Sequence, residues 1–180
     1  MDEREQIGDC LERLWAQPFE GCCQISVVAG DPEGSTIRAV RDDRVVCLIS
    51  QRGRGRQMNA GAAEATGEIL LFLHVDTRLP ADALARIDSV MGMNGYIGGA
   101  FELGIDSERP LLKYIAARAN RRSRRYQMPY GDQAIFLSRT YFRVIGGFRD
   151  IPIMEDLDLM RRIRREGGQI HILDQKVMTS

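Results

Sequence analysis

The sequence has no excess of charge of either sign, no long apolar run and no cysteine pair spaced for a metal. Its 180 residues carry 25 Lys and Arg against 25 Asp and Glu, so no overall charge attracts nucleic acid or an anionic membrane. No apolar run approaches the roughly 20 residues of a membrane-spanning helix. The four cysteines include no C-x-x-C, and neither histidine is near them. We therefore expect reduced thiols in a cytoplasmic protein, and no signal peptide in the acidic start "MDEREQIGDCLERL".

Helical and strand patterns alternate along most of the chain. Helices are predicted over 3–15, over 54–67 with Gly67 as its end, over 80–91, over 110–126, after Ser138 and after Met154. Short β-branched or apolar runs predict strands over 24–30, 44–50, 69–75, 98–105, 133–138 and 169–173. This alternation indicates an α/β fold with a mostly parallel sheet flanked by helices. Because no repeat or linker is visible, we expect one domain over residues 1–180.

The stretch "GEILLFLHVDTRLP", residues 67–80, ends an apolar strand in His74 and Asp76. Ligands of open α/β sheets bind at the carboxyl ends of strands, so this pair is a candidate site. The alternative is that Asp76 and Thr77 only cap the helix that begins near Pro80. A lone His-x-Asp does not decide between these two interpretations.

Three stretches favour the functional interpretation: "RGRGRQMNAGAAEATGEILLFLHVDT", "GDQAIFLSRTYFRVIGGF" and "IMEDLDLMRRIRREG". Read in order, they resemble family 2 glycosyltransferases, which have the GT-A fold, over about residues 3–180. In particular they resemble a bacterial subgroup found beside radical-SAM and selenium-related genes. The resemblance implies inverting, metal-dependent transfer of a sugar from a nucleotide-diphosphate donor, expected to be a UDP-sugar, to an acceptor hydroxyl.

The resemblance implies roles for the strand-end pair. Asp76 matches the metal-side carboxylate of the family's D-x-D-type motif, which holds Mn²⁺ or Mg²⁺ against the donor diphosphate. A hard cation bound by a carboxylate and phosphate oxygens neutralises the charge of the leaving group. His74 stands where most of the family has the first Asp. We expect it to orient phosphate or ribose, because imidazole suits softer metals.

The stretch "MEDLDL" resembles the family's E-D motif. By that match Asp156 is the general base that takes the proton of the acceptor hydroxyl, and Glu155 orients the acceptor or Asp156. A helix start, with its positive dipole end, favours an ionised carboxylate at that position. The alternative is that Glu155 and Asp156 are only favourable first-turn acids and Asp158 a solvated one.

The same resemblance implies a donor surface and an acceptor loop. The donor residues are Gly55, Arg56 and Asn59, which match the segment that reads base and ribose, and Gly131, Asp132 and Gln133, which match the turn lining the sugar pocket. The alternative for the first set is an ordinary basic loop leading into a helix, and the match favours ligand contact. The loop Gly146-Gly147-Phe148 matches the acceptor side, and its glycines also suit a helix stop.

The sequence departs from the family pattern in three places. The family opens with a central strand like "VSVIIPxxNE", whereas this chain begins at Met1-Asp2-Glu3 as if just after it. Ala29 stands where an Asp usually contacts the base, so Asp31 is a candidate substitute. The family's Arg/Trp-rich C-terminal segment does not follow "TS". We expect a fragment or a shortened sequence rather than a sheet repaired in another way, and the alternative function is nucleotide binding without catalysis.

A second open question is the stretch "RANRRSRRYQ", with five arginines from Arg118 to Arg125. It is compatible with a solvated helix face, with anionic lipid or a phosphorylated acceptor, and with RNA. The balanced charge favours the solvated face; peripheral contact with the inner face of the membrane comes next, and nucleic acid last. The acceptor is accordingly expected to be lipid-linked or a small molecule.

Two further expectations concern the basic segments. In "RRIRR", residues 161–165, we expect an exposed helix face with an ion pair between Asp158 and Arg162. A nucleotidyltransferase, the third function class, would need a Gly-rich phosphate loop after the first strand. "GRGR" lies too late in the chain for that role.

Overall fold

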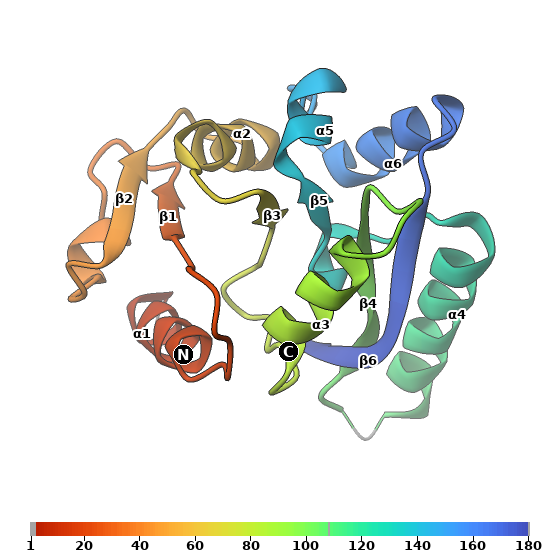
Figure 1. Ribbon diagram of the computed structural model, residues 1–180. Coiled ribbons are helices and arrows are strands. Elements are labelled where there is room, and N and C mark those ends of the chain that lie inside the picture. The colour runs from red at the N-terminus through yellow and green to blue at the C-terminus, as the bar shows by residue number, and fades with distance from the viewer. Residues whose placement is uncertain (1–2, 108, 180) are drawn as a thin grey trace.

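The computed structural model describes residues 3–107 and 109–179, in which helices and strands alternate as predicted (Figure 1). The helices are α1 (Glu3–Trp15), α2 (Arg54–Glu64), α3 (Ala83–Met91), α4 (Pro110–Tyr126), α5 (Arg139–Val144) and α6 (Glu155–Arg165). The strands are β1 (Ile25–Ala29), β2 (Val45–Ile49), β3 (Ile69–Leu71), β4 (Gly98–Ile105), β5 (Phe136–Ser138) and β6 (Ile170–Thr179). Short 3₁₀ turns are η1 (Ile37–Ala39) and η2 (Gly131–Gln133).

The strands form two sheets. β1 and β2 pair in parallel, and the other sheet has the order β3-β5-β4-β6. β4 and β6 are parallel, whereas β5 is antiparallel to both β3 and β4. The α/β fold is confirmed, and its strand pairing is more mixed than the mostly parallel sheet that the alternation predicted. The contact between β4 and β5 depends on Gly98, because a side chain there would collide with the Phe136 carbonyl.

The two sheets are not joined by a strand in the part of the chain that the structure describes. β1 and β3 lie next to each other in Figure 1, yet each pairs only on its far side, β1 with β2 and β3 with β5. The sequence predicted an interrupted sheet, and in the described part of the structure the strands are indeed unpaired between β1 and β3. α1 covers this end of the molecule by packing Ile7 and Leu11 against Val27 and Val45.

Helices cover both faces of the larger sheet. On one face, Leu159 and Ile163 of α6 and Phe142 of α5 pack with Leu137 of β5. On the other face, α3 packs Ile87 against the rings and side chains of the β4–β5 pair. α6 carries acids in its first turn and arginines in its last, which complements the helix dipole.

Several predicted boundaries are wrong by a few residues. α2 ends at Glu64 and not at Gly67, because the Gln24 side chain donates to the Glu64 carbonyl and accepts from the Thr66 amide. β6 continues to Thr179 instead of ending at residue 173, since it stays paired with β4 past a register shift. The helix stop at Gly146-Gly147 is confirmed, as both residues have positive φ.

The segment after β3 is also different from its prediction. β3 ends at Leu71, and α3 begins only at Ala83, with Asp82 at its N-cap position. Asp76 lies seven residues before that helix, so the helix-cap alternative for Asp76 and Thr77 is wrong. The backbone instead turns between His74 and Thr77, where the Thr77 amide donates to the His74 carbonyl at 3.0 Å.

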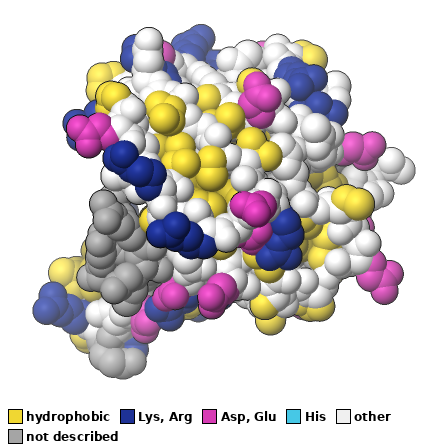
Figure 2. Space-filling model, turned by 90° about the vertical axis from the view of Figure 1, so that its left-hand side faces the viewer, with side chains coloured by type: hydrophobic (Ala, Val, Ile, Leu, Met, Phe, Trp, Pro, Cys, Tyr) yellow, Lys and Arg dark blue, Asp and Glu magenta, His cyan; other side chains and the backbone are white. Residues whose placement is uncertain are grey.

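The surface on the β1–β2 side shows hydrophobic side chains near the middle of the face and charged side chains of both signs around them (Figure 2). Ile49, at the end of β2, is 58% exposed. Within the described ranges, no helix is both long and apolar enough to cross a membrane.

Candidate active site

Three segments far apart in the sequence meet around Asp156. Its Oδ2 accepts a hydrogen bond from the Gly131 amide at 2.6 Å, and its Oδ1 accepts one from the Leu157 amide at 2.6 Å. A Cβ added at Gly131 would lie 3.0 Å from His74 Nε2 and 3.4 Å from Asp156 Oδ2. The glycine therefore lets the imidazole of His74, in the turn after β3, approach the η2 turn and the start of α6. The two backbone amides hold the carboxylate of Asp156 in one orientation.

Asp132 adds a second carboxylate to this cluster. Burial is the main cause that raises the pKa of its carboxyl above the ordinary value, and the charge of His74 opposes that shift. Asp156 adds to the increase, since two neighbouring carboxylates disfavour double ionisation. Asp132 Oδ1 is buried and has no hydrogen-bond partner among the described residues. The cluster thus combines two different carboxylates. That of Asp156 accepts two backbone hydrogen bonds, and that of Asp132 is buried with one oxygen unpaired among the described residues.

The side chain of Gln133 stabilises the η2 turn that carries Gly131 and Asp132. This side chain is fully buried. Its Oε1 accepts from Ser123 Oγ at 2.8 Å and from the Tyr130 amide at 3.1 Å, and its Nε2 donates to the Phe101 carbonyl at 2.8 Å. Because the protein itself supplies all three hydrogen-bond partners, the Gln133 side chain fixes the turn and does not face solvent.

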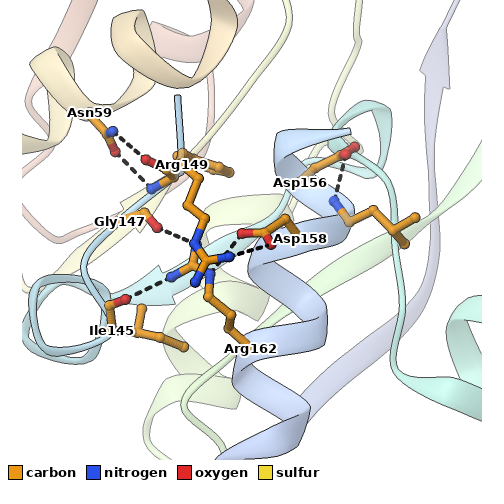
Figure 3. A network of polar contacts seen from close by, with 9 residues as sticks. Asn59, Ile145, Gly147, Arg149, Asp156, Asp158 and Arg162 are labelled. Atoms are coloured by element: carbon orange, nitrogen blue, oxygen red, sulfur yellow. Dashed lines mark hydrogen bonds and ion pairs between the residues drawn. The ribbon is translucent and has the colours of Figure 1, made fainter. Parts of the chain in front are cut away.

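The loop between α5 and α6 is held by Arg162, as Figure 3 shows. Arg162 Nε donates to Asp158 Oδ2 at 2.8 Å, which confirms the predicted pair, and Nη1 donates to the Ile145 carbonyl at 2.7 Å. Nη2 donates to the Gly147 carbonyl. The side chain of Arg162 is only 11% exposed, so the prediction of an exposed "RRIRR" face is wrong for this residue. Glu155, about two turns earlier on the same helix, is also buried.

Replacing Arg162 by Ala is expected to destabilise the protein by about 3 kcal/mol. The change removes the closer of the two arginines that pair with Asp158 and leaves two carbonyls without their donor. Urea unfolding followed by circular dichroism measures the loss. Arg161→Ala is the matched control, since Arg161 is the exposed neighbour on the same helix. Equal stabilities of the two variants would contradict the role given to Arg162.

The predicted base-and-ribose residues all contact the loop 148–150. Asn59 Nδ2 donates to the Phe148 carbonyl at 2.7 Å, and its Oδ1 accepts from the Phe148 amide at 2.9 Å. A Cβ at Gly55 would lie 2.8 Å from the Arg149 carbonyl oxygen. Arg56 forms an ion pair with Asp150. The structure thus joins the predicted donor segment to the predicted acceptor loop, and the nucleotide contacts themselves stay predictions.

The chain matches a known family over most of its length. Residues 2–149 match the sequence profile of Glycosyl transferase family 2. The chain belongs to this family. No curated protein sequence matches it significantly. Family membership supports a function in glycosyl transfer, as the three quoted stretches predicted.

Two solved structures resemble this family 2 chain in fold. One is described as "Mannosyltransferase PcManGT from Pyrobaculum calidifontis in complex with GDP-Man and Mn2+", with a TM-score of 0.75 and 19% identity. It is matched over 98% of this chain and 53% of its own. The other is S. aureus TarS, with a TM-score of 0.74 and 15% identity over 99% of this chain and 35% of its own. This chain therefore spans about half or less of the length of these two proteins, and the GT-A fold is confirmed.

Among the described residues, no hydrogen bond links Asp76 or Asp31 to the Asp156 cluster of this family 2 chain. Asp76 is exposed and borders a hollow beside α1 that is also lined by Asp9 and Asp106. No hydrogen bond or ion pair of the described residues joins Asp76 to Asp156. Among the same residues, no group of three or more His, Cys, Asp or Glu side chains could hold a metal ion. Asp31 accepts from the hydroxyl of Ser35 at 2.6 Å, which is the main reason that the pKa of Asp31 is lowered.

Sequence reasoning missed two residues that support the site. Ser123 donates to Gln133, and the Arg122 guanidinium lies 3.4 Å from the ring centre of Tyr130, immediately before Gly131. The sequence pattern indicates for both residues only that they belong to a basic helix. The available signal was Ser123 itself, a polar residue on the inward stripe that Ala116 and Ala119 define.

Proposed function

We propose that the protein transfers a sugar from a nucleotide-diphosphate donor to an acceptor hydroxyl, with inversion at the anomeric carbon and Asp156 as general base. The observation that carries the proposal is the position of Asp156 in a family 2 chain, held by the Gly131 amide beside His74. Two backbone amides bind this carboxylate at the helix start and fix its orientation.

The proposed role of Asp156 follows from that environment. An acceptor hydroxyl within hydrogen-bond distance of the carboxylate gives up its proton as its oxygen attacks the anomeric carbon. The attack comes from the face opposite the nucleoside diphosphate, which leaves with the bonding electrons. Glu155 is buried directly before Asp156 and is proposed as a positioning residue for it.

We assign the divalent cation, Mn²⁺ or Mg²⁺, to Asp76. The donor set fits because an exposed carboxylate offers hard oxygen and leaves the other coordination positions to phosphate oxygens. When bound, the cation neutralises charge on the departing diphosphate. His74, whose Nε2 lies close to Gly131, is proposed to orient phosphate or ribose. The Mn²⁺ and GDP-Man in the PcManGT structure support this class of ligand, and UDP remains our proposed nucleotide.

The sugar is proposed to lie against Asp132. Asp132 Oδ1 and Arg122 Nη2 are both buried without a partner among the described residues. A sugar hydroxyl can donate to the first and accept from the second, which would satisfy both atoms. Gly131 and Gln133 then hold this surface in place rather than read the sugar.

Asp132→Asn is expected to weaken donor binding about tenfold, through the loss of a charged hydrogen bond, and to raise the thermal midpoint at pH 7 by roughly a few degrees. The midpoint rises because the folded-state pKa of Asp132 is raised, so ionisation destabilises the native protein. This gain should vanish as the pH falls below about 4, where the carboxyl is neutral in both states. Fluorescence titration and scanning calorimetry measure the two effects. A variant with lower stability and unchanged donor affinity would contradict the assignment.

A lipid-linked acceptor is the better supported of the two acceptor classes. Ile151, Ile153 and Met154 directly precede Glu155 and are 37%, 72% and 51% exposed. Apolar side chains that are exposed beside a general base suit an acceptor with an apolar part. A small polar acceptor would leave them in water.

Release of nucleotide from a panel of UDP- and GDP-sugars, with Mn²⁺ present, tests the proposal. We expect turnover with at least one donor, slow with water and faster with an acceptor. Binding of nucleotide without any release, by a folded protein, would instead favour the alternative of a nucleotide-binding protein without catalysis.

A further inference from the structure

Helix α4 buries small side chains and exposes large ones. Ala116, Ala119 and Ser123 face the protein, together with Asn120, which accepts from the Leu103 amide at 2.7 Å and donates to the Leu103 carbonyl at 2.9 Å. These contacts attach α4 to β4 along its whole middle. The opposite face of the helix exposes large apolar side chains.

That outer face begins with three large hydrophobic residues. Leu111, Tyr114 and Ile115 are 67%, 58% and 47% exposed, and they lie on one side because they are three and four positions apart. Single exposed apolar residues are ordinary, but adjacent ones on one helix face indicate a contact surface. α4 forms the outer wall of the molecule beside β4 and β6, so this face is open (Figure 1).

The same face continues into arginines. Arg118, Arg121 and Arg125 follow at helical spacing and are exposed, and α4 contains no Asp or Glu. Within residues 3–107 and 109–179, no carboxylate forms an ion pair with any of these three. Arg124, by contrast, pairs with Glu102 of β4. The outer face of α4 thus has an apolar half and an uncompensated basic half.

We propose that α4 docks onto a bilayer that contains anionic lipid. Leu111, Tyr114 and Ile115 would enter the boundary between headgroups and acyl chains, and Arg118, Arg121 and Arg125 would contact lipid phosphates. The apolar half favours a bilayer over RNA, because a nucleic-acid surface has no use for exposed leucine and isoleucine. The docking is independent of the proposed transferase reaction.

The docking face adjoins the candidate active site. Arg122, on the flank of α4, stacks on Tyr130, which precedes the Gly131 that binds Asp156. A bilayer against α4 would therefore bring lipid-linked molecules to the neighbourhood of the site. The docking face would then place lipid-linked molecules near the site as well as attach the protein to the bilayer.

Co-sedimentation with phosphatidylcholine vesicles, with and without phosphatidylglycerol, tests the docking. We expect binding only to the anionic vesicles. The triple variant Arg118→Ala, Arg121→Ala, Arg125→Ala should bind roughly a hundredfold more weakly, at about 1 kcal/mol for each arginine. Leu111→Ser with Ile115→Ser, which keeps every charge, should lose roughly tenfold.

The control removes the same charge elsewhere, with Arg161→Ala, Arg164→Ala and Arg165→Ala on the exposed face of α6. It should bind within about twofold of the parent protein. The proposal is overturned if this control loses as much binding as the α4 triple variant. It is equally overturned if anionic vesicles are not bound, or if the protein binds a single-stranded RNA oligonucleotide instead. Circular dichroism checks that each variant is folded, and no donor is needed, so failure of catalysis does not affect the result.

Discussion

Asp156→Asn should lower nucleotide release about a thousandfold, within the range that a general base contributes. The amide keeps the size of the carboxylate, but it cannot take the proton of the acceptor hydroxyl. Its oxygen can still accept from the Gly131 amide, which holds the carboxylate at 2.6 Å in the parent protein. Donor affinity should therefore change little, and the loss should appear in kcat and not in donor binding.

Asp88→Asn is the matched control, because Asp88 is an exposed aspartate on α3, away from the cluster. Its turnover should equal that of the parent protein. Release of nucleotide is followed by coupled assay at saturating donor, and donor affinity by fluorescence. If Asp156→Asn keeps more than a tenth of the parent kcat, Asp156 is only a first-turn acid of α6.

Asp76→Ala should weaken Mn²⁺ binding in the presence of UDP by about a hundredfold. One carboxylate is the only metal ligand that we assign to the protein, so its removal leaves the cation to phosphate and water alone. The electron paramagnetic resonance signal of free Mn²⁺, titrated with protein and UDP, reports the bound fraction directly.

The control for Asp76 is Asp9→Ala, which removes a carboxylate from the same hollow. It changes the local charge by the same amount and should alter Mn²⁺ binding by less than about threefold, as expected of a partly screened surface charge. Equal losses in the two variants would mean that the hollow attracts the cation by charge alone, and the ligand role of Asp76 would be wrong.

The elements with strong local patterns could be predicted from the sequence. Residues 98–105 alternate and 110–126 begin at a proline, and both form the predicted element with the predicted bounds. The end of α2 could not be predicted, because it is set by Gln24, forty residues away. The antiparallel β5 was missed for a similar reason, since its pairing depends on the approach that Gly98 allows.

The candidate site was predictable in outline but not in its support. Quoted motifs named His74, Gly131 and Asp156, which the structure brings together. The spacing of these three residues in the sequence does not predict which side chains support them. Gln133 was expected at the sugar and is instead buried beneath the turn, while Arg162 was expected on the surface and instead anchors the Gly147 loop. Such roles depend on burial, which a single sequence does not reveal.

Calorimetric titration of the protein with UDP and with GDP, each with and without Mn²⁺, tests the central claim most directly. The account predicts saturable binding of one of the two nucleotides that requires Mn²⁺ and is lost in Asp76→Ala. If the folded protein binds neither nucleotide under any metal condition, the cluster around Asp156 is no donor site in this chain. His74 and Asp76 would then be ordinary residues of the turn that follows β3.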